Sequence, residues 1–220
     1  MSIGHLSVSR DTGDYYALSI MDEILGAGSL ASRFYSRICS REGLDAGTRF
    51  GFGVYYAGVF RAYFQSKSSS CAEATSIALE EISRIRNEKV TGEELEQAVD
   101  HAIEDFPRYF ASAATTVERF ADDEYTHRKP GFWQSYCERM RAVKREDIQR
   151  VAEKYLRPDK LITLAVGDVE AMMRGNPDKP LYSFQKLAKG KPINLIPLPD
   201  PVTMTYPKLT VSKSRSPEKP

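Results

Sequence analysis

The chain has 220 residues, of which 41% are hydrophobic and 28% charged, so it is long enough for one sizeable core and has the composition of an ordinary globular protein. Its 31 basic and 30 acidic residues leave a net charge of +1, which gives no reason to expect a nucleic acid or an anionic membrane as partner. No apolar run approaches the roughly 20 residues that span a bilayer. Three separated cysteines without a CxxC pair predict neither a disulfide framework nor a thiolate metal site.

The chain opens in a predicted strand over residues 3–8, in which Leu6 and Val8 alternate with Ser7 and Ser9. A start inside a strand is typical of a half-chain from a two-domain protein. We therefore expect a cytoplasmic protein if Met1 is the native start, and a periplasmic or exported one if the chain is a piece of a longer protein.

Residues 11–46 predict two helices joined by an elbow of small residues. The first helix carries an apolar stripe at three- and four-residue spacing, formed by Tyr15, Leu18, Met21 and Leu25. Gly26 and Gly28 are expected to end it, because glycine adopts left-handed backbone conformations at no cost. Ser29 can cap the second helix. The buried stripe of that helix would be Leu30, Phe34 and Ile38.

A hairpin is predicted over residues 48–65, with a turn at Ala57 and Gly58. Alternation places one set of apolar side chains on the core face: Phe50, Phe52, Val54, Phe60, Ala62 and Phe64. Gly51 and Gly53 lie on the other face. They indicate either the close approach of another backbone or a ligand, or a simple bulge.

Helices dominate the next hundred residues. Residues 71–85 form an apolar stripe whose one polar member is Glu81. Thr91 and Glu94 form a capping box that starts the following helix. Pro107 should kink or end that helix, because proline lacks a donor and clashes with the preceding turn.

The starts of two further helices are predicted after Pro107. Thr115 with Glu118 offers a second capping box. Pro130 suits the first turn of a helix. That helix would run through Trp133, Tyr136 and Met140. A last helix over residues 148–155 and a short strand over residues 161–166 complete the pattern, which fits an α+β two-layer sandwich with a mostly antiparallel sheet and helices packed on one face.

The character of the chain changes after Asp168. Nine of the twelve prolines lie from Pro177 onward, and proline favours an extended backbone. We therefore predict a domain over residues 1–170, an extended proline-rich segment packing on it over residues 171–206, and a disordered tail over residues 207–220.

Several phrases of the sequence resemble one family. They are DYYAL at residues 14–18, ILG at 24–26, SR at 32–33, GL at 43–44, TGEELEQA at 91–98 and AVKREDIQRVAEKYLRPDKLITLAVGD at 142–168. Together they are similar to the carboxy-terminal, non-metal-binding domain of the pitrilysin/insulinase-type zinc peptidases, the inverzincin group that includes mitochondrial processing peptidase. The resemblance covers roughly residues 3 to 169. It implies a processing-peptidase-like metallopeptidase fold.

A zinc peptidase of this family is expected to carry His-x-x-Glu-His on a helix, which this chain lacks. A near-match is His101 with Glu104 and Asp105, where Asp stands in place of the second His. An enzyme built on those three residues is the minor alternative, since such polar clusters are common on solvated helix faces. His5 and His127 are expected at the surface or at a strand edge.

The family's carboxy-terminal half contributes an Arg and a Tyr that hold substrate against the zinc site of the other half. Aligned on GL at residues 43–44, these positions hold Cys39 and Ala46, which cannot do that work. Arg37, Arg41 and Tyr55 are the candidate substitutes, although a charged helix surface accounts for the two arginines as well.

The resemblance implies a non-catalytic domain or subunit of a zinc metalloendopeptidase. It would help to enclose a peptide-binding chamber together with a zinc-bearing homologous domain, or form a homodimer, with no nucleic acid or membrane partner. The zinc is expected in the partner domain, with no cofactor, metal ligand or catalytic residue in this chain. The alternative is a structural or assembly protein of the same fold with no peptidase role.

Overall fold

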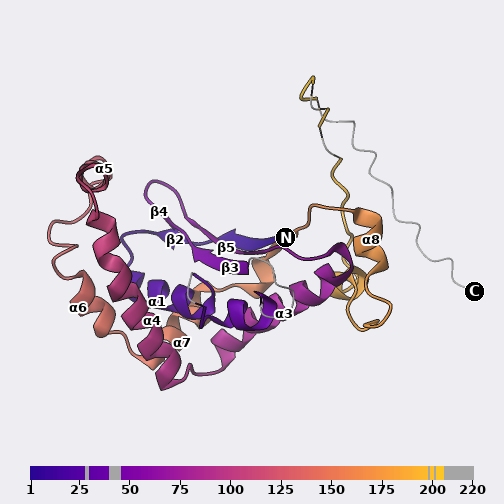
Figure 1. Cartoon of the computed structure of the whole chain (residues 1–220), viewed down its shortest axis with the longest axis horizontal. Helices are drawn as coiled ribbons and strands as arrows, with labels where there is room; N and C mark the ends of the chain where they lie inside the picture. Colours follow the sequence, from indigo (N-terminus) through magenta and orange to yellow (C-terminus); the bar gives the residue numbers. More distant parts are fainter. Residues whose placement is uncertain (28–29, 40–45, 198, 201, 206–220) are drawn as a thin grey trace, which may run out of the picture.

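The computed structural model describes residues 1–27, 30–39, 46–197, 199–200 and 202–205. An antiparallel sheet carries helices on one face, as Figure 1 shows. Its strands run in the order β3 (Ala46–Phe50), β5 (Val59–Phe64), β1 (Ser2–Leu6) and β6 (Ile162–Leu164). The predicted α+β class, with helices on one face, is confirmed.

The first strand shows its core face at odd-numbered residues. Ile3 lies opposite Ala62 and is fully buried, whereas Leu6 is 63% exposed on the other face. The predicted alternation through Leu6 and Val8 is therefore wrong. The reason is that β1 ends at Leu6, and the chain starts a separate two-residue strand, β2 (Val8–Ser9), which pairs in parallel with β4 (Phe52–Gly53).

The first predicted helix forms as α1 (Tyr15–Leu25), with Leu18, Met21 and Leu25 buried. Gly26 follows it in an extended conformation with φ 175°, so the expected left-handed conformation is wrong there. Glycine is needed at this position for another reason, because a Cβ would lie 2.8 Å from the backbone nitrogen of Thr48. Strand β3 thus runs directly against the end of α1.

The second predicted helix is only partly present. The structure forms a π-helical turn over Tyr35–Cys39, and Phe34 and Ile38 are buried. Leu30 is 71% exposed and does not join the buried stripe. Gly28 and Ser29 lie outside the described residues.

The hairpin of β3 and β5 pairs Phe50 with Phe60. Its core face is confirmed, since Phe50, Phe60, Ala62 and Phe64 are buried. Its connection is longer than the predicted two-residue turn, and Val54 is 37% exposed. Of the alternatives open for Gly53, the structure shows a close backbone approach, because a Cβ there would lie 1.7 Å from the carbonyl oxygen of Tyr56 in the same loop.

Helices α1, α3 (Cys71–Asn87), α4 (Gly92–Asp105) and α7 (Arg145–Tyr155) form the layer beneath the sheet. The short 3₁₀ turns η2 (Ser68–Ser70) and η4 (Pro158–Lys160) precede α3 and β6. The capping box of Thr91 and Glu94 is confirmed at the start of α4. Pro107 lies in the 3₁₀ turn η3 (Phe106–Phe110), which ends that helix.

The next two helices begin elsewhere than predicted. Helix α5 (Ala113–Tyr125) is capped by Ser112, whose hydroxyl accepts from the amide of Thr115, so the box of Thr115 with Glu118 is wrong. Helix α6 (Tyr136–Arg141) begins well after Pro130. Gly131 has φ 80°, a left-handed conformation that cannot continue a right-handed helix.

The last part of the described chain forms α8 (Val169–Arg174) and α9 (Phe184–Ala188) beside the N-terminal end of α3. Between them, Lys179 Nζ lies 2.8 Å from both carboxylate oxygens of Glu73 on α3. Residues 192–197 lead away from the body, as Figure 1 shows. The predicted disordered tail, residues 207–220, lies outside the described residues.

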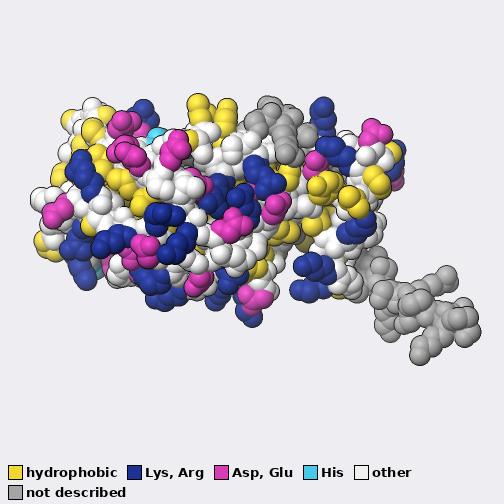
Figure 2. Space-filling view, turned by 90° about the horizontal axis from the view of Figure 1, so that it is seen from below, with side chains coloured by type: hydrophobic (Ala, Val, Ile, Leu, Met, Phe, Trp, Pro, Cys, Tyr) yellow, Lys and Arg dark blue, Asp and Glu magenta, His cyan; other side chains and the backbone are white. Residues whose placement is uncertain are grey.

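None of the helices in the described part of the chain is both long and apolar enough to cross a bilayer. The helix side of the molecule, seen in Figure 2, carries Lys and Arg side chains interspersed with Asp and Glu. Such mixed charge is typical of a solvated surface.

Candidate functional site

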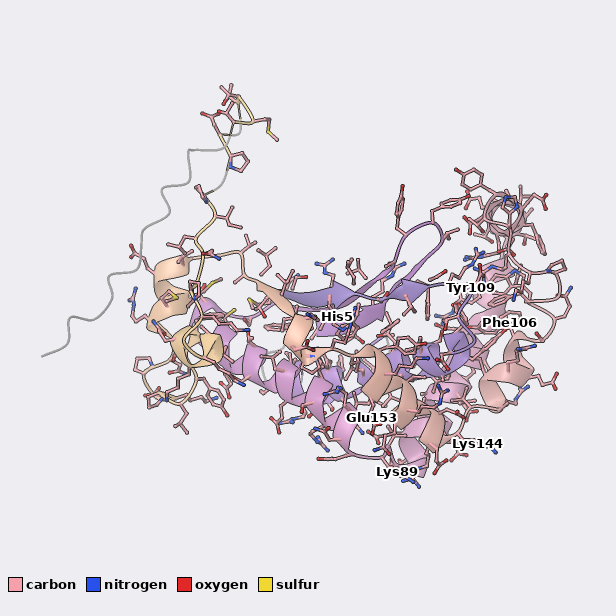
Figure 3. The ribbon with its side chains drawn as sticks, turned by 180° about the vertical axis from the view of Figure 1, so that it is seen from behind. His5, Lys89, Phe106, Tyr109, Lys144 and Glu153 are labelled. Carbon is pink, nitrogen blue, oxygen red and sulfur yellow. The ribbon has the colours of Figure 1, made fainter. Side chains whose placement is uncertain are left out.

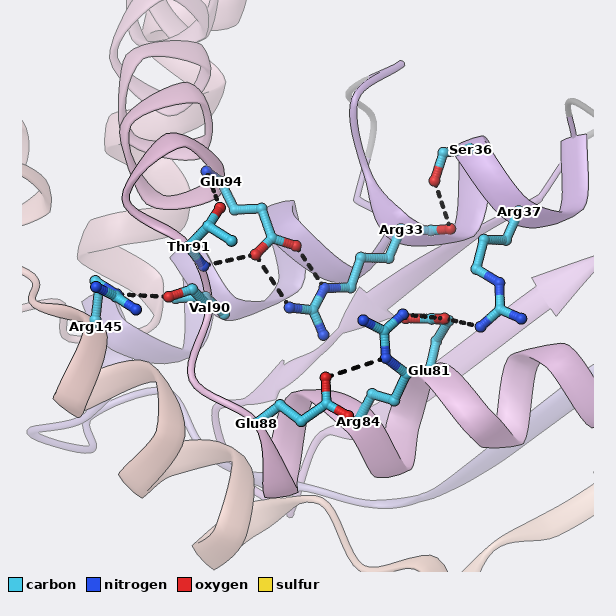
Figure 4. A network of polar contacts seen from close by, with 10 residues as sticks. All are labelled: Arg33, Ser36, Arg37, Glu81, Arg84, Glu88, Val90, Thr91, Glu94 and Arg145. Atoms are coloured by element: carbon cyan, nitrogen blue, oxygen red, sulfur yellow. Dashed lines mark hydrogen bonds and ion pairs between the residues drawn. The ribbon is translucent and has the colours of Figure 1, made fainter.

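Arg37, a candidate substrate-holding residue, lies in a charged network between the π-helical turn and α3, drawn in Figure 4. Its guanidinium donates to the carboxylates of Glu80, at 3.1 Å, and Glu81. Glu81 is 0% exposed and also accepts from Arg84 at 3.0 Å. The hydrogen bonds that Arg37 and Arg84 donate to these carboxylates raise the pKa of both guanidinium groups. Arg37 is therefore already engaged in neutralising a buried carboxylate.

A second buried ion pair ties the same segment to α4. Arg33 donates from Nε and Nη2 to the two carboxylate oxygens of Glu94, at 2.7 and 3.1 Å. Glu94 also accepts from the backbone amide of Thr91, so one carboxylate serves both the ion pair and the helix cap. Burial opposes ionisation of Glu94, but the hydrogen bonds from Arg33 and Thr91 outweigh it and lower the pKa of this carboxyl.

The other positions taken from the resemblance are spread over the fold. Cys39 ends the π-helical turn, but its side chain is outside the described residues, as is all of Arg41. Ala46 opens β3, opposite Phe64. Tyr55 lies in the loop between β4 and β5, where its ring is largely exposed and its hydroxyl donates to the carbonyl oxygen of Tyr125, at 3.2 Å.

The structure does not bring Arg37 and Tyr55 to a common neighbour. Arg37 contacts carboxylates of α3, whereas Tyr55 contacts the end of α5. The two residues therefore do not form the paired arrangement that the resemblance assigns to the positions of Cys39 and Ala46.

His101 does not gather ligands with Glu104 and Asp105. Its Nδ1 lies 3.0 Å from Glu23 Oε2, which joins α4 to α1. Glu104 is exposed. Within the described ranges, no three His, Cys, Asp or Glu side chains lie close enough to hold a metal ion.

His5 is buried in β1, labelled in Figure 3, so its predicted surface position is wrong. The strand is flanked on both sides, which the sequence around it does not show. Its Nδ1 lies 2.9 Å from the carbonyl oxygen of Leu6, and its Nε2 accepts from the backbone amide of Arg157, at 3.2 Å. These partners fit a neutral imidazole protonated at Nδ1, and burial lowers its pKa. His127 is exposed, as expected.

Asp22 is a buried carboxylate that sequence reasoning missed. It lies on the core side of α1 and accepts from the Thr48 hydroxyl at 2.7 Å and from the Phe50 amide at 2.6 Å. Burial raises the pKa of Asp22 to about 6 despite these hydrogen bonds. The sequence did contain a signal for this burial, because Asp22 lies between Met21 and Ile24, which both belong to the buried face of the helix.

The sheet face turned away from the helices is open and carries exposed apolar side chains, together with Arg49 and Arg61, which lie opposite each other across β3 and β5. We call this surface the outer sheet face. Cross-strand pairing places Leu6 beside Val59, and Gly4 beside Ile162. The apolar side chains it exposes are Leu6 at 63%, Val59 at 50%, Ile162 at 74% and Leu164 at 50%. Exposed β6 is also an edge strand of the sheet. Exposed apolar side chains grouped on one face are typical of interaction sites.

Comparison with known proteins finds a family model that matches the first part of the chain. Residues 1–101 match the family model described as the peptidase M16 inactive domain. A search of curated proteins finds no match.

Solved structures share the fold. An M16 inactive domain from Pseudomonas fluorescens superposes with a TM-score of 0.66 at 19% identity, over 76% of this chain and 42% of that one. The inactive peptidase domain of a candidate zinc protease from Bordetella parapertussis superposes with a TM-score of 0.58 at 16% identity, over 73% of this chain and 87% of that one. A chain of complex III2 from Candida albicans superposes with a TM-score of 0.60 at 13% identity, over 70% of this chain and 39% of that one.

The chain spans less than half the length of the first three solved chains that it matches, at 42%, 39% and 37%.

Proposed function

Because the chain belongs over residues 1–101 to the peptidase M16 inactive-domain family, we propose that it works with a zinc-bearing homologous domain and helps that domain to enclose a peptide-binding chamber. Its part is non-catalytic. The observation that carries the proposal is the outer sheet face, which none of the described helices covers.

The two sides of the molecule differ in a way that supports this seating. The helix side carries interspersed charges and is suited to water (Figure 2). The outer sheet face exposes Leu6, Val59, Ile162 and Leu164, whose burial against a partner would be favourable at about 25 cal/mol per Å² of apolar surface. A homologous domain is therefore expected to sit over the sheet rather than against the helices.

The described residues of this chain do not fit a catalytic zinc. Such a site needs three protein ligands and an open position for water. His101 pairs with Glu23, and His5 has both ring nitrogens engaged by backbone groups. The metal and the base that activates water would come from the partner domain.

Contact with a peptide would fall to exposed groups. Of the proposed substitutes in the described chain, Tyr55 keeps a largely exposed ring, whereas Arg37 is bound to Glu80 and Glu81. Tyr55 is the one that the geometry favours for holding a peptide.

A second candidate function is a structural subunit with no peptidase role. The likeness in fold to a chain of complex III2 supports it, and so does the presence of Cys39 and Ala46 where the resemblance expects an Arg and a Tyr. Both candidates need a partner. They differ in whether the assembly hydrolyses peptides.

The test compares the purified chain with the chain co-expressed with a His-x-x-Glu-His protein of the M16 family from the same genome. Zinc content and cleavage of a peptide library are measured for both samples. Zinc and chelator-sensitive hydrolysis found only in the complex support the first function. A stable zinc-loaded complex that cleaves nothing supports the structural role, and stoichiometric zinc with hydrolysis by the chain alone refutes both.

A further inference from the structure

The segment after α9 exposes apolar side chains away from the folded body. We call the described residues 192–197, 199–200 and 202–205 the C-terminal arm. Ile193 is 43%, Leu195 65% and Ile196 64% exposed. No described residue between Pro192 and Pro197 makes a backbone hydrogen bond to another part of the described chain.

The composition of the arm favours an extended shape. Pro192, Pro197 and Pro199 fix their own φ angles and lack amide donors. Proline-rich segments of this kind are pre-extended, so docking them costs less conformational entropy than docking a flexible peptide. The arm is thus suited to lie along an apolar surface of a partner.

The arm ends in a turn rather than a continuing strand. The amide of Asp200 donates to Thr205 O at 2.9 Å, and the amide of Met204 donates to Asp200 O at 2.8 Å. This turn presents two more apolar side chains, Val202 at 89% and Met204 at 69% exposure.

The arm and the outer sheet face are turned to the same side. In Figures 1 and 3 the arm leaves the body beside α8 and runs beyond the sheet, away from the helices that cover the inner face. A domain seated on the outer sheet face would therefore meet the arm along its flank.

The area of the outer sheet face shows why a partner would need the arm. Four strands 4.8 Å apart, the longest of them six residues at 3.3 Å per residue, offer at most about 300 Å². Stable interfaces bury at least about 600 Å² on each partner. Residues 192–197, about 19 Å long and 10 Å wide, add roughly 190 Å². The turn with Val202 and Met204 supplies further apolar surface.

We propose that the C-terminal arm is the second half of the interface with the zinc-bearing domain and clasps that domain at the flank of the outer sheet face. The inference rests on the proposed function, and it adds a specific segment of the chain to the contact. The surface that receives the arm must be apolar, and open enough for an extended peptide with few donors.

The test replaces Leu195→Asp and Ile196→Asp together and measures the Kd for the zinc-loaded partner protein by titration calorimetry. We expect the Kd to rise at least about tenfold, because two exposed anchors become charged. Leu181→Asp is the matched control, since Leu181 is 75% exposed but lies outside the arm. The control should change the Kd by less than about twofold, and thermal unfolding of the free chain should be unchanged in both variants.

The outcomes separate the two proposals. If the wild-type chain forms no complex with the partner protein, the proposed function fails and the role of the arm fails with it. If a complex forms and the arm variant binds as tightly as the wild type, only the role of the arm is overturned. An arm variant that binds more tightly overturns it too, because the arm would then cover the outer sheet face of its own chain and compete with the partner.

Discussion

Asp22 provides the sharpest test of how the core is held together. Its carboxylate joins α1 to β3 through the Thr48 hydroxyl and the Phe50 amide, and burial raises its pKa to about 6. The substitution Asp22→Asn keeps the shape and removes the charge. The amide oxygen of asparagine can accept from Phe50, and its NH₂ group can donate to Thr48.

The magnitude follows from the two pKa values of Asp22. An unfolded Asp titrates near 3.9, so the folded state binds the proton more tightly by about two pKa units, or roughly 3 kcal/mol. Because the native state holds more protons between pH 4 and 6, this group makes the free energy of unfolding fall as the pH rises through that window. The charged carboxylate thus destabilises the fold above pH 6.

We expect Asp22→Asn to raise the free energy of unfolding by about 1–3 kcal/mol at pH 7.5, and to leave it close to the wild-type value at pH 4. Asp22→Ala should be destabilised instead, since the buried Phe50 amide loses its acceptor at a cost of about 1–3 kcal/mol. Urea unfolding followed by circular dichroism at pH 4, 5, 6 and 7.5 measures each value.

Subtracting the free energy of unfolding of the wild type from that of Asp22→Asn at each pH removes the contribution of other groups that titrate in this range. His5 is one of them, because burial lowers its pKa and acid therefore destabilises the fold through it. Two results would refute the reasoning. The first is a difference in unfolding free energy between wild type and Asp22→Asn that does not change with pH, and the second is an Asp22→Asn variant as unstable at pH 7.5 as Asp22→Ala. Either result would mean that the surroundings of Asp22 stabilise its charge.

Three further predictions concern single side chains. Glu81→Gln should lower the free energy of unfolding in urea by about 1–3 kcal/mol, because it removes the charge of a buried carboxylate that accepts from two partly exposed arginines. The exposed Glu88→Gln should cost less than about 1 kcal/mol, and equal losses would contradict the buried position of Glu81. Ser112→Ala should cost about 1 kcal/mol and speed amide hydrogen exchange in α5 alone, and unchanged exchange there would count against the observed cap. Gly53→Ala should lower the thermal midpoint, since its Cβ would meet a backbone oxygen at 1.7 Å, while Gly92→Ala, with no atom within 4 Å, should leave the midpoint unchanged or higher.

Local signals in the sequence predicted much of the helical layer. The stripe from Tyr15 to Leu25 and the pairing of Thr91 with Glu94 depend on residues within a few positions of each other, and both appear as expected. The helix expected from Pro130 fails for a local reason as well, because Gly131 takes up a left-handed conformation that its residue type permits but does not require.

The features that define the candidate site depend on distant parts of the chain. The burial of His5 follows from the position of β1 inside the sheet, between strands that begin at Val59 and Ile162. The partners of Asp22 lie 26 and 28 residues away in sequence. Leu6 and Ile162 look like core residues in an alternating pattern, and only the sheet order shows that they lie on the open face. No short-range periodicity contains that information.

The position of β1 also limits how the protein can be divided. Because β1 lies between β5 and β6, its second neighbour is made from residues more than 150 positions later in the chain. Helix α7, which packs against both α1 and α3, is equally late. A fragment ending at residue 101 would include the whole match to the inactive-domain family, yet it would leave β1 at an edge and one side of α1 open. The segment that the family model matches is therefore smaller than the unit that these contacts hold together. Contacts of such long sequence separation delay the completion of the sheet until β6 has been synthesised.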